Sequence, residues 1–110
     1  MIVPAETWHL VFNRANGYCE YCGQDLLISR AAYASAQVDH VLGRSVGGMH
    51  NPENLRLACS QCNSSLSRYS HLTTFEERRA LALQKIKEYH QRNYDEKRSK
   101  LRGLAAANFG

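Results

Sequence analysis

Two Cys-x-x-Cys pairs constrain the fold of this chain more than any other feature of its sequence. Cys19 and Cys22 form the first pair and Cys59 and Cys62 the second, with 36 residues between Cys22 and Cys59. A tight turn lets each pair point two thiolates at one ion, and four thiolates make a closed, structural zinc site. We therefore predict one Zn²⁺ held by all four cysteines. Either pair alone would also be compatible with redox chemistry or a disulfide, and the presence of both makes the zinc site the better account.

The segment between the cysteine pairs is predicted to form a hairpin. A strand over residues 36–41 contains Asp39 and His40, and a loop rich in glycine follows it. The segment Asn54–Ala58 then alternates polar and apolar residues, which is typical of a half-buried strand. The residues after Cys62 can begin a helix. The expected unit is strand, loop, strand and helix, with a carboxylate and an imidazole near one joint and cysteines at the other.

Together these residues resemble the HNH endonuclease family, which has the ββα-metal fold. The resemblance covers about residues 19–63, and its motifs are the two cysteine pairs with Asp39-His40, Ser45-x-Gly47-Gly48, Asn54-Leu55 and Cys62-Asn63. It implies a small α+β domain of the HNH type over residues 1–100, with a structural zinc and with helices flanking the motif at both ends. The motif core is expected over residues 19–69.

Three positions depart from the family pattern. Asn63 stands where the family name expects a final His, so that the chain is similar to an HNN variant, and an amide oxygen replaces the imidazole as a ligand. Gly43 stands where Pro is usual, which loosens the loop. Leu66 stands where Lys is frequent, so that one phosphate contact is absent. None of the three departures removes a catalytic group.

His40, Asp39 and Asn63 suit the hydrolysis of a phosphodiester. An unperturbed imidazole titrates near pH ~6.5, so His40 can take a proton from water at neutral pH. The oxygens of Asp39 and Asn63 are the kind of ligand that Mg²⁺ or Mn²⁺ prefers, and such an ion would act as a Lewis acid. The resemblance implies the same roles, with His40 as general base, and implies that Asn54 braces the loop. Each of these residues taken singly also has an ordinary structural reading.

Strand geometry limits how Asp39 and His40 can cooperate. Successive side chains on a regular strand point to opposite faces, so the two can share a site only where the strand ends or bulges. The loop after the first strand is where we expect this.

Charge is concentrated downstream of the motif. The net charge is +4 at a pI near 9, and residues 1–63 contribute −1 while residues 64–110 contribute +5. A basic domain is compatible with a polyanionic partner. Three arginines flank the motif, and we expect them to contact phosphates: Arg44, Arg56 and Arg68.

Helices are predicted on both sides of the motif. Residues 4–16 form the first, which Gly17 ends. Residues 26–29 are interpreted as a short strand, followed by a loop or a helical turn. A helix from about residue 74 to residue 98 is expected to bury a stripe of Phe75, Arg79, Ala82, Leu83, Ile86 and His90. Its other face would hold Arg78, Lys85, Lys87, Arg92 and Lys97, and residues 101–110 would be a flexible tail.

We therefore expect a divalent-metal-dependent endonuclease that nicks or cleaves DNA, most readily double-stranded DNA. Backbone phosphates carry no sequence information, so specificity would come from a protein partner or a homodimer. Two alternatives remain: a zinc-stabilised nucleic-acid-binding module without catalysis, and a nuclease directed at RNA. No apolar run is long enough to span a membrane and no signal peptide is evident, so a cytoplasmic location is expected.

Overall fold

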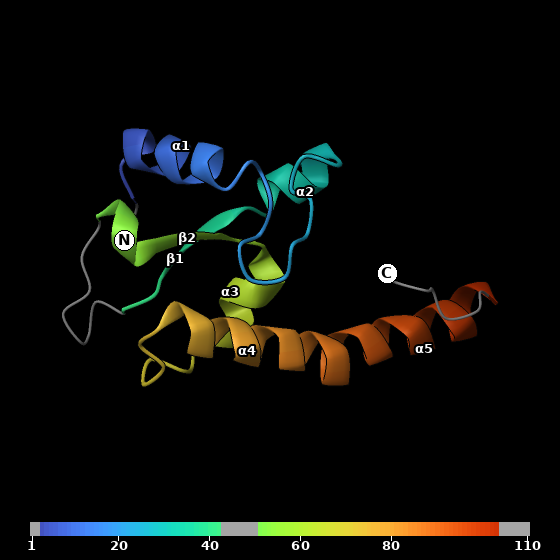
Figure 1. Ribbon diagram of the computed structural model, residues 1–110. Helices are drawn as coiled ribbons and strands as arrows, with labels where there is room; N and C mark the ends of the chain where they lie inside the picture. Colours follow the sequence, from blue (N-terminus) through green and yellow to red (C-terminus); the bar gives the residue numbers. More distant parts are fainter. Residues whose placement is uncertain (1–2, 43–50, 104–110) are drawn as a thin grey trace.

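A computed structural model describes residues 3–42 and 51–103 of the 110-residue chain. Gly43 and Arg44, with the rest of the glycine-rich loop up to residue 50, lie outside the described residues, as do residues 104–110. The described parts form a small mixed domain of helices around one two-stranded sheet (Figure 1). The expected α+β class is confirmed.

The sheet is the predicted hairpin. Strand β1 (Gln37–His40) runs antiparallel to β2 (Leu55–Ala58), and the short 3₁₀ turn η2 (Pro52–Asn54) leads into β2. The register pairs Asp39 with Arg56 and His40 with Leu55. Cross-strand partners share a face, so Asp39 and Arg56 lie on one face of the hairpin and His40 and Leu55 on the other.

Helix α1 (Ala5–Arg14) covers the face that carries Leu55 and Leu57 (Figure 1). Val11 on α1 belongs to the same buried cluster as these two leucines. The helix ends at Arg14, two residues before the predicted end, and the chain turns through Asn16 and Gly17, whose φ values are +58° and +76°. A Cβ on Gly17 would lie 2.8 Å from Leu27 Cδ1.

Helices α3 (Ser60–Leu66) and α4 (Phe75–Lys85) lie on the opposite side of the hairpin from α1 (Figure 1). Thr74 caps α4 through its hydroxyl, which accepts from the backbone N–H of Glu77 at 3.2 Å. The layer order is therefore α1, hairpin, α3, α4, and Asp39 is enclosed between the hairpin and the last two helices.

The C-terminal helix is longer than predicted. Helix α4 continues through one π-helical turn, η3 (Ile86–His90), into α5 (Gln91–Arg102), and Gly103 ends it in the left-handed conformation with φ +62°. Helix α5 projects beyond the body of the domain (Figure 1). Residues 101 and 102, expected in the tail, are helical.

The expectation for residues 26–29 was wrong, since they form a turn. Their only sheet-like neighbour is an isolated bridge between Tyr18 and Asp25, after which α2 (Arg30–Ala34) follows with Ser29 as its cap. Within residues 3–42 and 51–103, no helix is both long and apolar enough to cross a membrane.

Candidate nuclease site and zinc cluster

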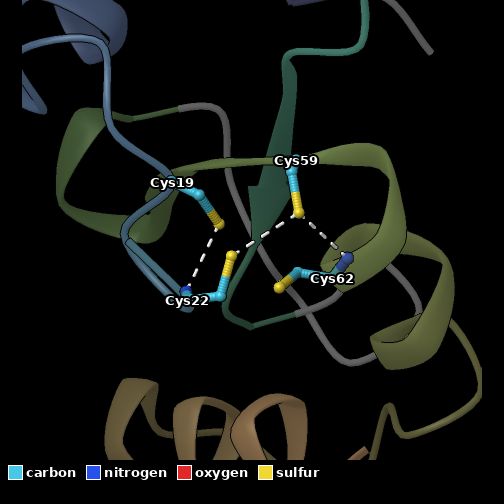
Figure 2. A group of neighbouring side chains, drawn as sticks. All are labelled: Cys19, Cys22, Cys59 and Cys62. Carbon is cyan, nitrogen blue, oxygen red and sulfur yellow. Dashed lines mark hydrogen bonds between the residues drawn. The ribbon is translucent and has the colours of Figure 1, made fainter. Parts of the chain in front are cut away.

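The two cysteine pairs meet at one end of the hairpin. Cys19 and Cys22 lie in the turn after α1, and Cys59 and Cys62 span the end of β2 and the first turn of α3 (Figure 2). In each pair the first sulfur accepts the backbone N–H of the second cysteine, at 3.5 Å for Cys22 and 3.4 Å for Cys62. The predicted grouping of four cysteines is confirmed.

The dimensions of the cluster fit a zinc ion. All four Sγ atoms lie within 4.8 Å of one another, and Cys22 Sγ is 3.8 Å from Cys59 Sγ. A tetrahedron with Zn–S bonds of about 2.3 Å has sulfur–sulfur edges of about 3.8 Å. Hydrogen bonds from the neighbouring thiols, that of Cys22 above all, lower the pKa of Cys19, and the hydrogen bonds with Cys19 raise the pKa of Cys22 and of Cys62.

The first cysteine pair also holds the free edge of β2. Between the two cysteines, the backbone N–H of Glu20 donates to Leu57 O at 2.8 Å, and the Glu20 carboxylate accepts from Leu57 N at 2.7 Å. Arg14 from the end of α1 pairs with Glu20 at 3.2 Å and donates to Pro52 O at 2.8 Å. The hairpin is thus fixed on its outer edge by the turn that carries Cys19 and Cys22.

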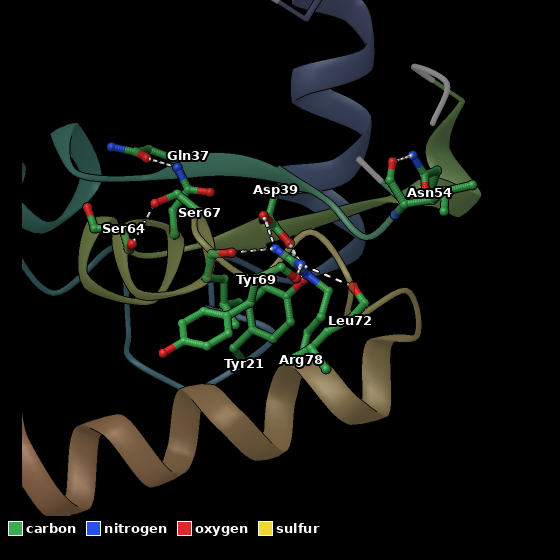
Figure 3. A network of polar contacts seen from close by, with 12 residues as sticks. Tyr21, Gln37, Asp39, Asn54, Ser64, Ser67, Tyr69, Leu72 and Arg78 are labelled. Carbon is green, nitrogen blue, oxygen red and sulfur yellow. Dashed lines mark hydrogen bonds and ion pairs between the residues drawn. The ribbon is translucent and has the colours of Figure 1, made fainter. Parts of the chain in front are cut away.

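Asp39 lies in a buried network with an arginine and a tyrosine (Figure 3). Arg78 Nε donates to Asp39 Oδ2 at 3.1 Å and Arg78 Nη2 to Oδ1 at 3.0 Å, a two-pronged ion pair. The Tyr21 hydroxyl also donates to Oδ2. Asp39 is 6% exposed and Arg78 is 4% exposed, so both charges are withdrawn from water.

The guanidinium of Arg78 makes hydrogen bonds to backbone carbonyls as well as to Asp39. Besides the carboxylate, its guanidinium donates to the backbone carbonyls of Leu66, Tyr69 and Leu72, which follow one another from the end of α3 through the next loop. Burial by itself would lower the pKa of Arg78, but the hydrogen bonds and charge of Asp39 outweigh it and raise the pKa. Burial, followed by the charge of Asp39, raises the pKa of Tyr21, so that this hydroxyl stays a donor.

The placement of Arg78 on the outer face of the C-terminal helix was wrong. The buried positions of α4 are Arg78 and Ala82, while Arg79, which was expected in the stripe, is exposed. The physical reason is the carboxylate of Asp39, which is buried on β1 and requires a counter-charge from the helix that covers it.

His40 is the last residue of β1 and is half-buried. The backbone just beyond it is clamped by Asn54, whose side chain accepts from Leu42 N at 2.8 Å and donates to Leu42 O at 3.0 Å. In addition, Val41 N donates to Asn54 O at 2.9 Å. These are the hydrogen bonds that the predicted bracing role of Asn54 requires.

Asn63 lies on the same side of the hairpin as Asp39. Its side-chain amide donates to Oε1 of Gln37, which precedes Asp39 by two residues on β1 and so shares its face. The strand pairing directs His40 to the other face. The expected base, His40, therefore lies on one face of β1, and the expected metal ligands, Asp39 and Asn63, lie on the other.

The side chains of Asp39 and Asn63 are chemically suited to bind a catalytic ion, but the hydrogen bonds around Asp39 oppose it. Carboxylate and amide oxygens suit Mg²⁺ or Mn²⁺, but both oxygens of Asp39 already accept from Arg78. An ion bound there would have to displace the guanidinium. The described arrangement is therefore not a ready metal site, and ligation by Asp39 and Asn63 stays a prediction.

The two described arginines of the predicted phosphate-binding set differ in their surroundings. Arg56 lies on the face opposite Leu55 and Leu57, as alternation predicts, but α4 partly covers it, and its guanidinium lies 4.8 Å from the centre of the Phe75 ring. Arg68 follows α3 and is exposed. Arg44 lies outside the described residues.

A hairpin followed by a helix, stapled by four cysteines, defines a zinc-type ββα domain. Residues 19–68 match the family model described as HNH endonuclease. The match identifies this segment of the chain as a domain of the HNH type, and it supports a nuclease-like or nucleic-acid-binding function. Comparisons with curated proteins and with solved structures found no match.

Sequence reasoning missed Tyr21 and Arg78, the two side chains that hold Asp39. Tyr21 was visible only as a spacer between Cys19 and Cys22. The helical spacing did not single out Arg78, because Phe75, Arg78 and Ala82 recur at three and four residues as well as Phe75, Arg79 and Ala82 do.

Proposed function

We propose that this protein is an endonuclease that hydrolyses phosphodiester bonds of DNA in the presence of Mg²⁺ or Mn²⁺, with His40 as the general base. The proposal rests on the HNH match over residues 19–68 and on the placement of His40 at the end of β1. The whole segment 1–100 would serve as one nuclease domain.

The observation that carries the proposal is the clamp of Asn54 on Leu42. Two side-chain hydrogen bonds hold both backbone polar groups of Leu42, the second residue after His40. A general base must lie within hydrogen-bond reach of the water that it deprotonates, so its backbone has to be fixed. Zinc at the other end of the hairpin would keep β2, and with it Asn54, in register.

In this reaction His40 would take the proton from a water molecule as that water attacks phosphorus, and the bond to the leaving oxygen would break. A divalent ion supplies charge stabilisation at the phosphate when bound. Asn63 offers an amide oxygen for such an ion. The Asp39 carboxylate could bind the ion only if its ion pair with Arg78 were broken, so we assign no step to the ion.

Plasmid cleavage with and without Mg²⁺ or Mn²⁺ tests the proposal. His40→Ala should lower the rate by about 10²–10⁴, the usual contribution of a positioned general base. Zinc content, folding and DNA binding should stay close to those of the wild type. His9→Ala is the matched control, because His9 is exposed on α1. Unchanged cleavage by His40→Ala would show that His40 is not the base.

The pairing of Asp39 with Arg78 favours a second candidate, a zinc-stabilised nucleic-acid-binding module without catalysis. In such a module the ion pair between Asp39 and Arg78 would serve only to stabilise the fold. The same assay separates the two candidates, since such a module binds plasmid DNA but leaves it intact under every metal condition. Replacing the plasmid by a structured RNA covers the remaining alternative, an RNA-directed nuclease.

A further inference from the structure

A groove lies between α3 with the residues that follow it and the middle of the long C-terminal helix, where α4 passes into η3. It has a volume of about 710 Å³, within the range of about 300–1,000 Å³ that is usual for ligand sites. Asn63, the last residue of the HNH motif, lies at its edge, and the far wall comes from Lys85, Tyr89 and His90. That wall lies outside residues 19–68, so it is an addition of this chain to the HNH segment.

The π-helical turn shapes this wall. The backbone N–H of Gln91 donates to Ile86 O, five residues back, instead of the four-residue step of an α-helix. The extra residue rotates the following side chains by roughly 100° relative to an uninterrupted helix. His90 Nε2 lies 3.0 Å from Ser65 Oγ on α3, which joins the two walls of the groove. Such turns are often found at functional sites.

The lining of the groove is mostly cationic and hydroxylic. Arg68 and Lys85 supply positive charge, and Ser64, Ser65 and Ser67 supply hydroxyls. The one acidic group is Glu88, whose carboxylate accepts from Gln84 on its own helix at 3.3 Å. The net charge of the lining is therefore positive, which favours an anion.

Two aromatic rings accompany these charges. Lys85 Nζ lies 5.9 Å from the centre of the Tyr69 ring, and Tyr89 is 57% exposed. An exposed ring beside cations is the combination by which proteins hold an unpaired nucleotide, because the base stacks on the ring while the cations face its phosphate. An inorganic anion would make no use of the rings.

We propose that this groove binds one unpaired nucleotide of a nucleic-acid strand, with its phosphate against Arg68 and Lys85 and its base on Tyr89. The proposal rests on the proposed function, since it takes nucleic acid as the partner, and it adds a preference for single-stranded or locally opened substrate. Asn63 at the edge of the groove places this nucleotide next to the HNH motif on the same strand.

Fluorescence anisotropy with a labelled single-stranded oligonucleotide tests the proposal, using the zinc-loaded full chain without added Mg²⁺. Arg68→Gln with Lys85→Gln should weaken binding about tenfold or more and reduce the salt slope by about 1.4, or 0.7 for each lost phosphate contact. Tyr89→Ala should weaken binding by about 5- to 100-fold, the effect of one lost stacked base, and Tyr89→Phe should restore it. Arg92→Gln with Lys87→Gln, exposed on the same helix and outside the groove lining, is the control.

The outcomes separate this proposal from the proposed function. If the wild type cuts DNA while the groove variants bind like the control pair, the groove proposal alone fails. If the wild type binds the oligonucleotide through the groove but cuts nothing, catalysis fails and the groove proposal stands. A matched duplex that binds more tightly than the single strand, or a mononucleotide that binds as tightly as the strand, would overturn the assignment to an unpaired nucleotide in a strand.

Discussion

Replacing Asp39 with Asn should destabilise the domain strongly, because it leaves the Arg78 guanidinium buried without its counter-ion. Arg78 is 4% exposed and makes two hydrogen bonds to this carboxylate. Removing one partner of a buried pair costs about 3–5 kcal/mol, against a total free energy of unfolding of about 5–15 kcal/mol for a typical domain. Arg78→Met should cost a similar amount, since it also strips three backbone carbonyls of their donor.

Urea denaturation followed by circular dichroism, with zinc and a reductant present, measures these losses. Arg79→Met is the control, because Arg79 is the next residue on α4 and is exposed. In the double variant, the second substitution should cost at least about 1 kcal/mol less than it does alone, as expected for partners in contact. If Arg78→Met is no more destabilising than Arg79→Met, the buried pair is not formed and the argument is refuted.

The same variants test whether Asp39 also binds the catalytic ion. Arg78→Met removes the guanidinium from both carboxylate oxygens and leaves the Tyr21 hydroxyl on Oδ2, so the Mn²⁺ affinity measured by electron paramagnetic resonance should rise above that of the wild type. In Asp39→Asn the affinity should fall. An affinity that is equal in the wild type and both variants would mean that Asp39 is not a metal ligand.

Three further predictions concern the zinc, the clamp and the arginines. Elemental analysis should find one zinc per chain, and stripping it should unfold the domain, because the apparent binding energy of structural zinc, about 10–16 kcal/mol, is folding energy; reduced protein that is folded without zinc would contradict this. Asn54→Ala should lose both hydrogen bonds to Leu42, at about 1–3 kcal/mol, and slow cleavage without shifting the metal titration. An unchanged rate would exclude the bracing role. Replacing Arg44, Arg56 and Arg68 together with Gln should reduce the salt slope of duplex binding by up to about 2.7, or 0.9 for each lost phosphate contact. An unchanged slope would place the contact surface elsewhere.

Features with a local sequence signal, or with a signal of fixed spacing, could be predicted from the sequence. The spacing within each cysteine pair predicts its geometry, since a tight turn places two thiolates together. The alternation of polar and apolar residues after Asn54 predicts β2. Gly17, which takes a positive φ, marks the end of the first helix. These features define the ββα unit and its cluster of four cysteines.

The partner of Asp39 could not be predicted, because it comes from a long-range contact. Arg78 is 39 residues away in the chain, and two neighbouring arginines fit the helical spacing equally well. Only the position of α4 against the hairpin decides which of them is buried. The π-helical turn was equally hidden, since the apolar stripe from Phe75 to Ile86 continues smoothly as an α-helix would.

The projection of α5 beyond the domain has a consequence for hydrogen exchange. A helix of 12 residues is marginal by itself in water, so α5 depends on continuity with α4 for its order. Amide protection should therefore decrease along the helix, from values set by global unfolding at Ala82 to rapid local opening near Leu101. The slow-exchanging core should end close to His90, whose side chain lies 3.0 Å from Ser65 Oγ on α3.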